Sequence, residues 1–289
     1  MQKAVMAKVV QLFSNPHAGT YSRRRVQSLV RALQDLGATV VQSFSADAPP
    51  EILDGVDHVC IAGGDGTVRH VASAVLRCGR PVTMSIYPVG TVNLLARERL
   101  YPACASDFAR LVMADAHGKD HFPVVVGEDF FFACASVGPD SMALDCYSPR
   151  LKRLIGRGAY GFAFLGLLWR WRRHRIRLNA EGVAVECEAF YVAKGRYYAG
   201  PWSLAPASRG DDPLMHVIAL ERARRIDFAR LVLALFFRRA IDTVPGAVCF
   251  TTTDLKVESD EALPLQADGD ILATLPVRFM IGRTPLSFR

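Results

Sequence analysis

The sequence predicts an α/β domain followed by a β-rich domain. Strand-like and helix-like stretches alternate with short loops as far as Gly118, and the later runs are mostly strand-like. Strand–helix alternation predicts a parallel sheet with helices on both faces. Short strands separated by turn residues predict a second domain rich in β-structure. We therefore place the two domains at residues 1–119 and 120–289.

Apolar periodicity places each element of the first domain. Residues 7–13, AKVVQLF, form a short β-branched run and predict a buried first strand. The next stretch, 23–36, has apolar residues at helical spacing, and Gly37 ends it. The remaining predicted strands are 39–44, 58–62 and 81–86, and the remaining predicted helices are 68–76 and 93–99.

The second domain is predicted to contain many strands and two helices. One helix begins at Ser148-Pro149, a pair suited to a helix cap and first turn. The other helix spans residues 226–240. The predicted strands are 122–126, 130–135, 176–179, 183–192, 214–220, 247–257 and 274–280.

Composition narrows the class of protein. The 289 residues are 51% hydrophobic and 22% charged, so the chain can bury a core and is not disordered. Seven cysteines show neither a CxxC pair nor zinc-site spacing, which predicts free, mostly buried thiols in a reducing compartment. The sequence has no apolar run of about 18 residues and no signal-peptide pattern. We expect a cytoplasmic protein.

The stretch GGDGT, residues 63–67, lies between a predicted strand and a predicted helix. Glycines there let backbone N–H groups face an anion at the helix N-terminus, where the helix dipole also favours negative charge. Asp65 would repel a bare phosphate, so its presence indicates Mg²⁺ beside the phosphate. The alternative is an ordinary strand-to-helix turn capped by Asp65 or Thr67. The stretch fits neither the Rossmann fingerprint nor the P-loop.

Two further polar, glycine-containing loops follow strands of the same predicted sheet. They are SNPHAG, residues 14–19, and PVGTVN, residues 88–93. Ligands of parallel sheets bind at the carboxyl ends of the strands, so the three loops together predict a nucleotide site. Phosphoryl transfer would also need positive charge, which an arginine of 23–25 could supply, and a carboxylate that accepts the hydroxyl proton.

The motifs NPxxG, GGDGT and PxGTxN, in this order, resemble the diacylglycerol kinase and sphingosine kinase family of lipid kinases. GGDGT also occurs in NAD kinases and phosphofructokinases, but three later segments favour the lipid kinases. The resemblance implies a nucleotide-binding domain like that of NAD kinase and phosphofructokinase, to which the final residues return, and a lipid-binding β-sandwich. The later segments are VGPDSMALDCYSPRLKRLIGRGAY, YYAGPWSLAPASRGDDPLMHV and LPLQADGD.

The resemblance also implies a nucleotide site that binds ATP with Mg²⁺. Asp65 would join the Mg²⁺–water network and serve catalysis. The implied nucleotide-binding residues are Asn15, Ser45, Gly63, Gly64, Asp65, Gly66, Thr67, Val68, Arg69 and Thr91.

The proton acceptor of this family lies in a DGE motif, which corresponds here to Asp268-Gly269-Asp270. The family glutamate is therefore an aspartate, shorter by one methylene. Position favours Asp270 as the base, while Asp268 shares that role or binds the metal. Some bacterial members bind a structural Mg²⁺ at a position matching Arg209, Asp212 and Leu214, and an ordinary acidic turn is the alternative there.

The implied function is transfer of the γ-phosphoryl group of ATP to a hydroxyl of a membrane lipid, such as diacylglycerol or a sphingoid. Two alternatives stay open, a small-molecule kinase like NAD kinase and a lipid-binding regulator without catalysis. The net charge is +7, and the apolar stretches 158–171 and 226–237 have arginine flanks. These features predict peripheral contact with the anionic inner membrane face, a core helix being the alternative. No nucleic-acid-binding motif is present, and a homodimer stays open.

Overall fold

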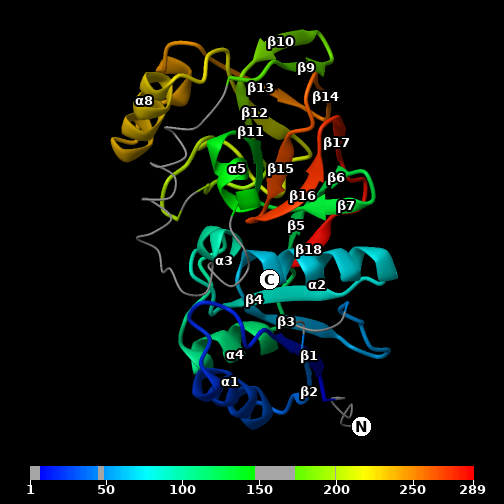
Figure 1. The fold of residues 1–289 in the computed structure, drawn as a ribbon. Coiled ribbons are helices and arrows are strands. Elements are labelled where there is room, and N and C mark those ends of the chain that lie inside the picture. Colours follow the sequence, from blue (N-terminus) through cyan, green and yellow to red (C-terminus); the bar gives the residue numbers. More distant parts are fainter. Residues whose placement is uncertain (1–6, 45–48, 147–172, 199) are drawn as a thin grey trace. The chain divides into compact units, whose positions relative to one another are not determined.

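The computed structural model describes residues 7–44, 49–146, 173–198 and 200–289 (Figure 1). The chain divides into two compact units, Met1–His121 with Thr284–Arg289, and Phe122–Arg283. The helix predicted from Ser148-Pro149, the apolar stretch 158–171 and the predicted site residue Ser45 lie outside the described residues.

The first unit is built on one six-stranded sheet of order β2-β1-β3-β4-β18-β5. The four strands from β2 to β4 are parallel, as strand–helix alternation requires. Every residue of β3 is buried, so both faces of the sheet are covered at its centre. The strand bounds are β1 Val9–Ser14, β2 Thr39–Phe44, β3 His58–Gly63, β4 Thr83–Pro88, β5 Lys119–His121 and β18 Leu286–Phe288.

The helices of this unit are α1 Arg23–Asp35, α2 Asp65–Cys78, α3 Leu94–Glu98 and α4 Ala105–Met113. Ser22 caps α1 by accepting a hydrogen bond from the Arg25 amide. The buried residues of α1 are Val26, Leu29 and Leu33, which recur at helical spacing. The sequence predicted the first three of these helices but not α4.

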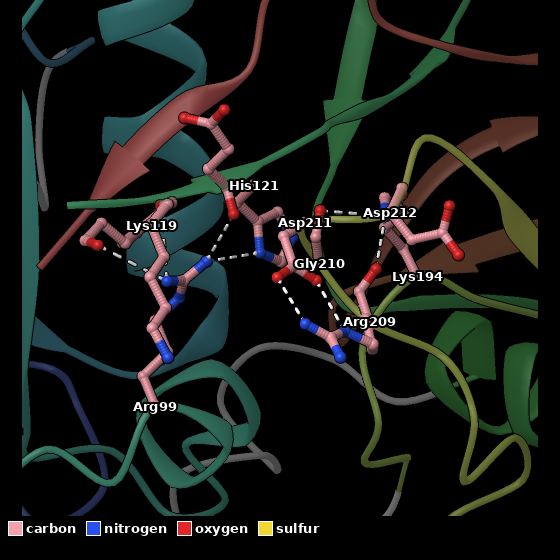
Figure 2. Close-up of polar contacts among 10 residues, drawn as sticks. Arg99, Lys119, His121, Lys194, Arg209, Gly210, Asp211 and Asp212 are labelled. Carbon is pink, nitrogen blue, oxygen red and sulfur yellow. Dashed lines mark hydrogen bonds and ion pairs between the residues drawn. The ribbon is translucent and has the colours of Figure 1, made fainter.

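Strand β18 brings the last part of the chain into the first unit. It pairs parallel with β4 and antiparallel with β5. The Arg99 guanidinium donates hydrogen bonds to the carbonyls of Lys119 and Phe288, each at 3.5 Å, and to the Asp120 carbonyl at 3.2 Å (Figure 2). One side chain from the end of α3 therefore bonds to both β18 and β5.

The second unit is a sandwich of two antiparallel sheets. Their strand orders are β10-β9-β14-β17-β6-β7 and β13-β12-β11-β8-β15-β16. Apolar side chains of both sheets form one buried core, in which the rings of Phe190 and Phe279 meet edge-on at 6.1 Å. The bounds are β6 Val124–Val126, β7 Asp129–Phe131, β8 Cys134–Val137, β9 Ile176–Ala180, β10 Val183–Cys187, β11 Ala189–Ala193, β12 Met215–Leu220, β13 Ala247–Thr252, β14 Asp254–Ser259, β15 Pro264–Ala267, β16 Asp270–Thr274 and β17 Val277–Ile281.

Among its described residues, the second unit also has three short helical segments. They are α5 Pro139–Cys146, α8 Arg225–Phe236 and a 3₁₀ turn at Ile241–Thr243. One side of α8 packs on β11 and β12, where Phe228 and Leu231 join a second buried apolar cluster. In the part of the chain that the structure describes, no helix combines the length and apolar character needed to cross a membrane.

Candidate nucleotide and catalytic site

The glycine loop of the first unit leads directly from β3 into α2. Gly64 is the helix N-cap, with extended backbone and no hydrogen bond from a capping side chain. The Val68 amide bonds to the Gly64 carbonyl at 3.0 Å and is the first amide of the helical pattern. The amides before Val68 lie in the first turn of α2, where backbone N–H groups have no carbonyl partner within the helix. This geometry suits an anion near Gly64–Thr67.

Close contact between loops explains why glycines stand here. A Cβ on Gly90 would lie 2.3 Å from the Gly64 Cα, and a Cβ on Gly63 would lie 2.5 Å from the Thr67 side chain. Both separations are far below normal contact distances. A Cβ on Gly19 would likewise lie 2.1 Å from the Thr91 hydroxyl oxygen. The glycines therefore let the three loops pack together, in addition to exposing backbone amides.

Polar side chains lock the same three loops. The Asn15 amide donates to the Thr67 hydroxyl at 3.0 Å, and the Thr20 hydroxyl donates to the Val89 carbonyl at 2.9 Å. Asp65 Oδ1 accepts a hydrogen bond from the Leu94 amide at 2.7 Å, which joins the glycine loop to the first residue of α3. The structure thus gathers the predicted loop residues in one place, and Thr20 is a member that the sequence analysis missed.

Two of the predicted nucleotide-binding residues are buried, and one predicted arginine is bonded to a backbone carbonyl at the end of β4. Val68 is 1% exposed and Arg69 is 7% exposed, so both side chains lie mainly inside the first unit. The Arg25 guanidinium donates to the Pro88 carbonyl at 3.3 Å and lies over the Tyr87 ring. Arg25 is therefore fixed beside the loop that follows β4.

In the second unit, Asp268 lies in the tight turn between β15 and β16, and Asp270 is the first residue of β16. Asp268 and Gly269 both have positive φ angles, 48° and 88°, as a two-residue hairpin turn requires. The buried Asp268 carboxylate accepts hydrogen bonds from the amides of Phe132, Ala133 and Cys134 at 2.8, 2.9 and 3.0 Å. Asp270 is half-buried at the start of β16.

These contacts decide how the two aspartates differ. Three amide donors already share the oxygens of Asp268, so its carboxylate does not fit a metal ligand well. Its observed contacts anchor the turn to the segment that leads into β8. Sequence spacing could not show this contact, because the partners are more than 130 residues apart in the chain.

The predicted structural metal position contains a buried lysine instead (Figure 2). The Lys194 side chain is 0% exposed, and its Nζ donates to the carbonyls of Arg209, Gly210 and Asp212 at 2.8, 3.1 and 2.6 Å. A divalent cation bound to the Arg209 carbonyl would lie against this ammonium, and like charges at such range repel strongly. The set Arg209, Asp212 and Leu214 therefore does not fit the Mg²⁺ that the resemblance implied.

Comparison of the sequence with models of protein families identifies the family of this chain. Residues 9–120 match the model described as diacylglycerol kinase catalytic domain. Residues 133–287, more than half of the chain, match the YegS C-terminal NAD kinase beta sandwich-like domain. The chain belongs to the diacylglycerol kinase family of lipid kinases.

Individual relatives agree with this membership. The kinase is 23% identical over 293 residues to a diacylglycerol kinase of Staphylococcus carnosus, covering 95% of this chain and 92% of that one. It is 28% identical over 232 residues to a Pseudomonas aeruginosa protein named "Probable lipid kinase YegS-like", covering 76% and 72%. A crystal structure of a diacylglycerol kinase from Bacillus anthracis has the same fold, with a TM-score of 0.79 at 18% identity and 99% and 98% coverage.

The second unit of this kinase also contains a polar network that the sequence analysis missed. Asp140 Oδ2 accepts hydrogen bonds from the Ser136 hydroxyl and the Tyr198 hydroxyl. Gln266 donates to Ser136 at 2.9 Å and accepts from the Gly269 amide at 3.2 Å, so the network reaches the turn between Asp268 and Asp270.

The carboxyl group in this network has a pKa shifted by burial. Burial raises the pKa of Asp140 above its ordinary value, although the two hydroxyl groups act in the opposite direction. Perturbed carboxyl groups of this kind occur preferentially at functional sites. The sequence signal was an aspartate just after the buried strand β8, in the segment VGPD.

Proposed function

We propose that this lipid kinase transfers the γ-phosphoryl group of ATP to a hydroxyl of a membrane lipid. The observation that carries the proposal is the interlocking of three loops at the N-terminus of α2, inside the region that matches a diacylglycerol kinase catalytic domain. An anion bound there would meet backbone amides and the positive end of a 14-residue helix.

Each part of the loop cluster has a role in this proposal. The residues from Gly63 to Thr67 hold the phosphates through the backbone, and Thr91 contributes a hydroxyl from the neighbouring loop. Asn15 fixes Thr67, so it acts through that residue. Mg²⁺, where bound, would neutralise charge on the phosphates, and Asp65 would hold it or its water ligands.

We assign the proton acceptor to Asp270 rather than Asp268. A general base needs an oxygen that can approach the substrate hydroxyl to within hydrogen-bonding distance. Asp268 is 4% exposed and its oxygens accept three amide hydrogen bonds. Asp270 is two residues away and half-buried, so its side chain is more accessible.

The proposal is tested by supplying γ-labelled ATP, Mg²⁺ and total bacterial lipid dispersed in detergent. Label should appear in the organic phase, and mass analysis of that phase names the lipid. Label in a water-soluble product would indicate a small-molecule kinase, and no transfer would indicate a regulator. Either result would refute the proposal.

The base assignment has its own test. Asp270→Asn should lower kcat by about 10²-fold or more with little change in ATP binding, because a base acts on the hydroxyl and not on the nucleotide. Asp270→Glu restores a carboxylate and is the matched control. Full activity of Asp270→Asn would exclude this residue as the base.

We further propose that the enzyme acts as a peripheral membrane protein at an anionic surface. A diacyl or sphingoid substrate stays in the bilayer, so the enzyme must approach it there. The net charge of +7 favours approach to anionic lipid head groups.

A further inference from the structure

Helix α8 has large apolar residues on both its buried and its exposed side. Phe228, Leu231 and Ala234 are buried against the second sheet. The opposite side, called here the α8 apolar face, is exposed by 46 to 63% per residue and consists of Ile226, Val232, Leu233, Phe236 and Phe237. Helices that are apolar all round are normally covered on every side.

The apolar face forms one continuous strip. Residues 226, 233 and 237 are spaced by seven and four positions, which places them on the same side of a helix. Phe236 and Phe237 lie together at its end, with ring centroids 5.3 Å apart. Figure 1 shows α8 at the outer margin of the second unit. Large contiguous apolar patches on a surface mark an interaction site.

Positive charge surrounds this strip. Six arginines and one acidic residue lie between positions 222 and 239, and all six arginines are exposed. The acidic residue, Asp227, is 3% exposed and pairs with Arg224 at 2.8 Å and Arg230 at 3.5 Å. The face therefore presents guanidinium groups at both ends and no exposed carboxylate among residues 222–239.

Positive charge is concentrated at the start of α8, where Arg224 also caps the helix through hydrogen bonds to Asp227. Arg224 and Arg225 stand at the N-terminus of α8, where the helix dipole disfavours positive charge. Asp227 offsets part of this cost through its ion pairs. The remaining unfavourable interaction with the helix dipole would be offset if the arginines bind an external anionic surface.

The charge pattern also indicates which kind of partner binds the α8 apolar face. A symmetric contact between two copies of this face would bring one set of arginines against the same set in the partner, which is unfavourable. A protein partner would have to supply both a broad apolar groove and acidic residues at each end. An anionic bilayer supplies acyl chains below a continuous layer of negative head groups, which matches the apolar strip and its arginines together.

We propose that α8 is the membrane-docking element of this enzyme, with its apolar face inserted at the head-group boundary of an anionic bilayer and its arginines among the phosphates. The inference rests on the proposed lipid substrate for its biological meaning. The docking itself is a property of α8 and is measured without turnover.

The test is binding of the full chain to vesicles of phosphatidylglycerol and phosphatidylcholine, measured by sedimentation. The variant L233S/F236S/F237S should bind at least about tenfold more weakly, because it removes three exposed apolar side chains from the bilayer contact. Phe44→Ser is the matched control, since Phe44 and Phe236 are both 63% exposed. Phe44→Ser should bind like the wild type.

A second pair of variants tests the charges. R238Q/R239Q should lose about fivefold in affinity for each arginine, and the loss should disappear on pure phosphatidylcholine. R31Q/R110Q removes two exposed arginines of the first unit as a control and should have a smaller effect. Equal losses in the two double variants would show that only net charge matters, which would overturn the assignment to α8.

Two readouts separate this inference from the proposed function. All α8 variants should phosphorylate detergent-dispersed lipid like the wild type and should keep its thermal midpoint. Vesicle binding that depends on α8 without lipid phosphorylation would refute the kinase proposal and leave docking intact. Wild-type binding by the serine variant, absence of vesicle binding by the wild type, or self-association that the serine variant abolishes would refute docking.

Discussion

Replacing Lys194 by methionine should strongly destabilise the second unit while keeping the side-chain volume. The ammonium is buried and donates to three carbonyls. Two of these have a second donor, since the Phe122 amide bonds to the Gly210 carbonyl at 2.9 Å and the Asp212 amide bonds to the Arg209 carbonyl at 3.3 Å. The carbonyl of Asp212 would lose its 2.6 Å donor.

The expected magnitude follows from these contacts. Hydrogen bonds to charged groups contribute about 1.5–3 kcal/mol each, and an orphaned buried acceptor costs about 1–3 kcal/mol. Removing a buried charge recovers part of its desolvation cost. We therefore expect a net loss of about 3 kcal/mol in the free energy of unfolding. For a unit of this size that corresponds to about 6–12 °C in Tm.

Thermal unfolding of nucleotide-free protein, with EDTA or with MgCl₂, provides the assay. Wild-type Tm should not depend on EDTA, because the ammonium already supplies the positive charge among these carbonyls. Lys256→Met is the control, since Lys256 forms only an exposed pair with Glu258 and should change Tm little. The reasoning fails if EDTA lowers the wild-type Tm and Asp212→Asn removes that effect, since a divalent ion would then hold this segment.

Three other predictions concern titrating groups. Asp65→Asn should lower kcat about 10²-fold with little change in Tm, because asparagine keeps an acceptor for the Leu94 amide but loses the charge; normal turnover would refute its role. Burial raises the pKa of Asp140, so the stability that this carboxyl group contributes is present at low pH and is lost as the pH rises through its raised pKa. Asp140→Asn should therefore flatten the dependence of Tm on pH in that range. An unchanged dependence would contradict this prediction. Burial lowers the pKa of His58 from 6.5 to about 3, so stability should fall by about 1.4 kcal/mol per pH unit below 6.5. In urea titrations at several pH values, His58→Asn should remove this loss of stability at low pH. An equal loss in the wild type and the variant would assign the pH dependence to another group.

The sequence predicted the elements of the first unit well because periodicity and glycine positions are local signals. The predicted strand 58–62 and helix 68–76 correspond to β3 and α2, with boundaries shifted by a few residues. The shift at α2 arises because Asp65, Gly66 and Thr67 already belong to the helix. Periodicity could not include them, since two are polar and one is glycine.

Prediction was less successful where the chain changes sheets. The predicted strand 183–192 is two strands, β10 and β11, which lie in different sheets and meet at Glu188. The predicted strand 247–257 divides in the same way between β13 and β14. A continuous strand-like pattern gives no sign of such a switch, because both halves keep strand composition.

Contacts between distant backbone groups were also beyond prediction. The roles of Lys194 and Asp268 depend on carbonyls and amides, which every residue has, so sequence carries no pattern for them. Burial of cysteines was predicted only partly. Six of the seven cysteines, all except Cys146, are described as free thiols, as predicted, but Cys78, Cys104 and Cys249 are exposed.

The position of β18 has a consequence for biosynthesis. Because β18 lies between β4 and β5 in the first sheet, the whole second unit is an insertion between two parts of the first. A ribosome therefore releases residues 284–289 only after the complete second unit has been made. Until then β4 and β5 lack the strand that joins them, so the nascent first unit exposes unpaired strand edges of the kind that attract chaperones. The N-terminal unit, although translated first, completes its sheet last.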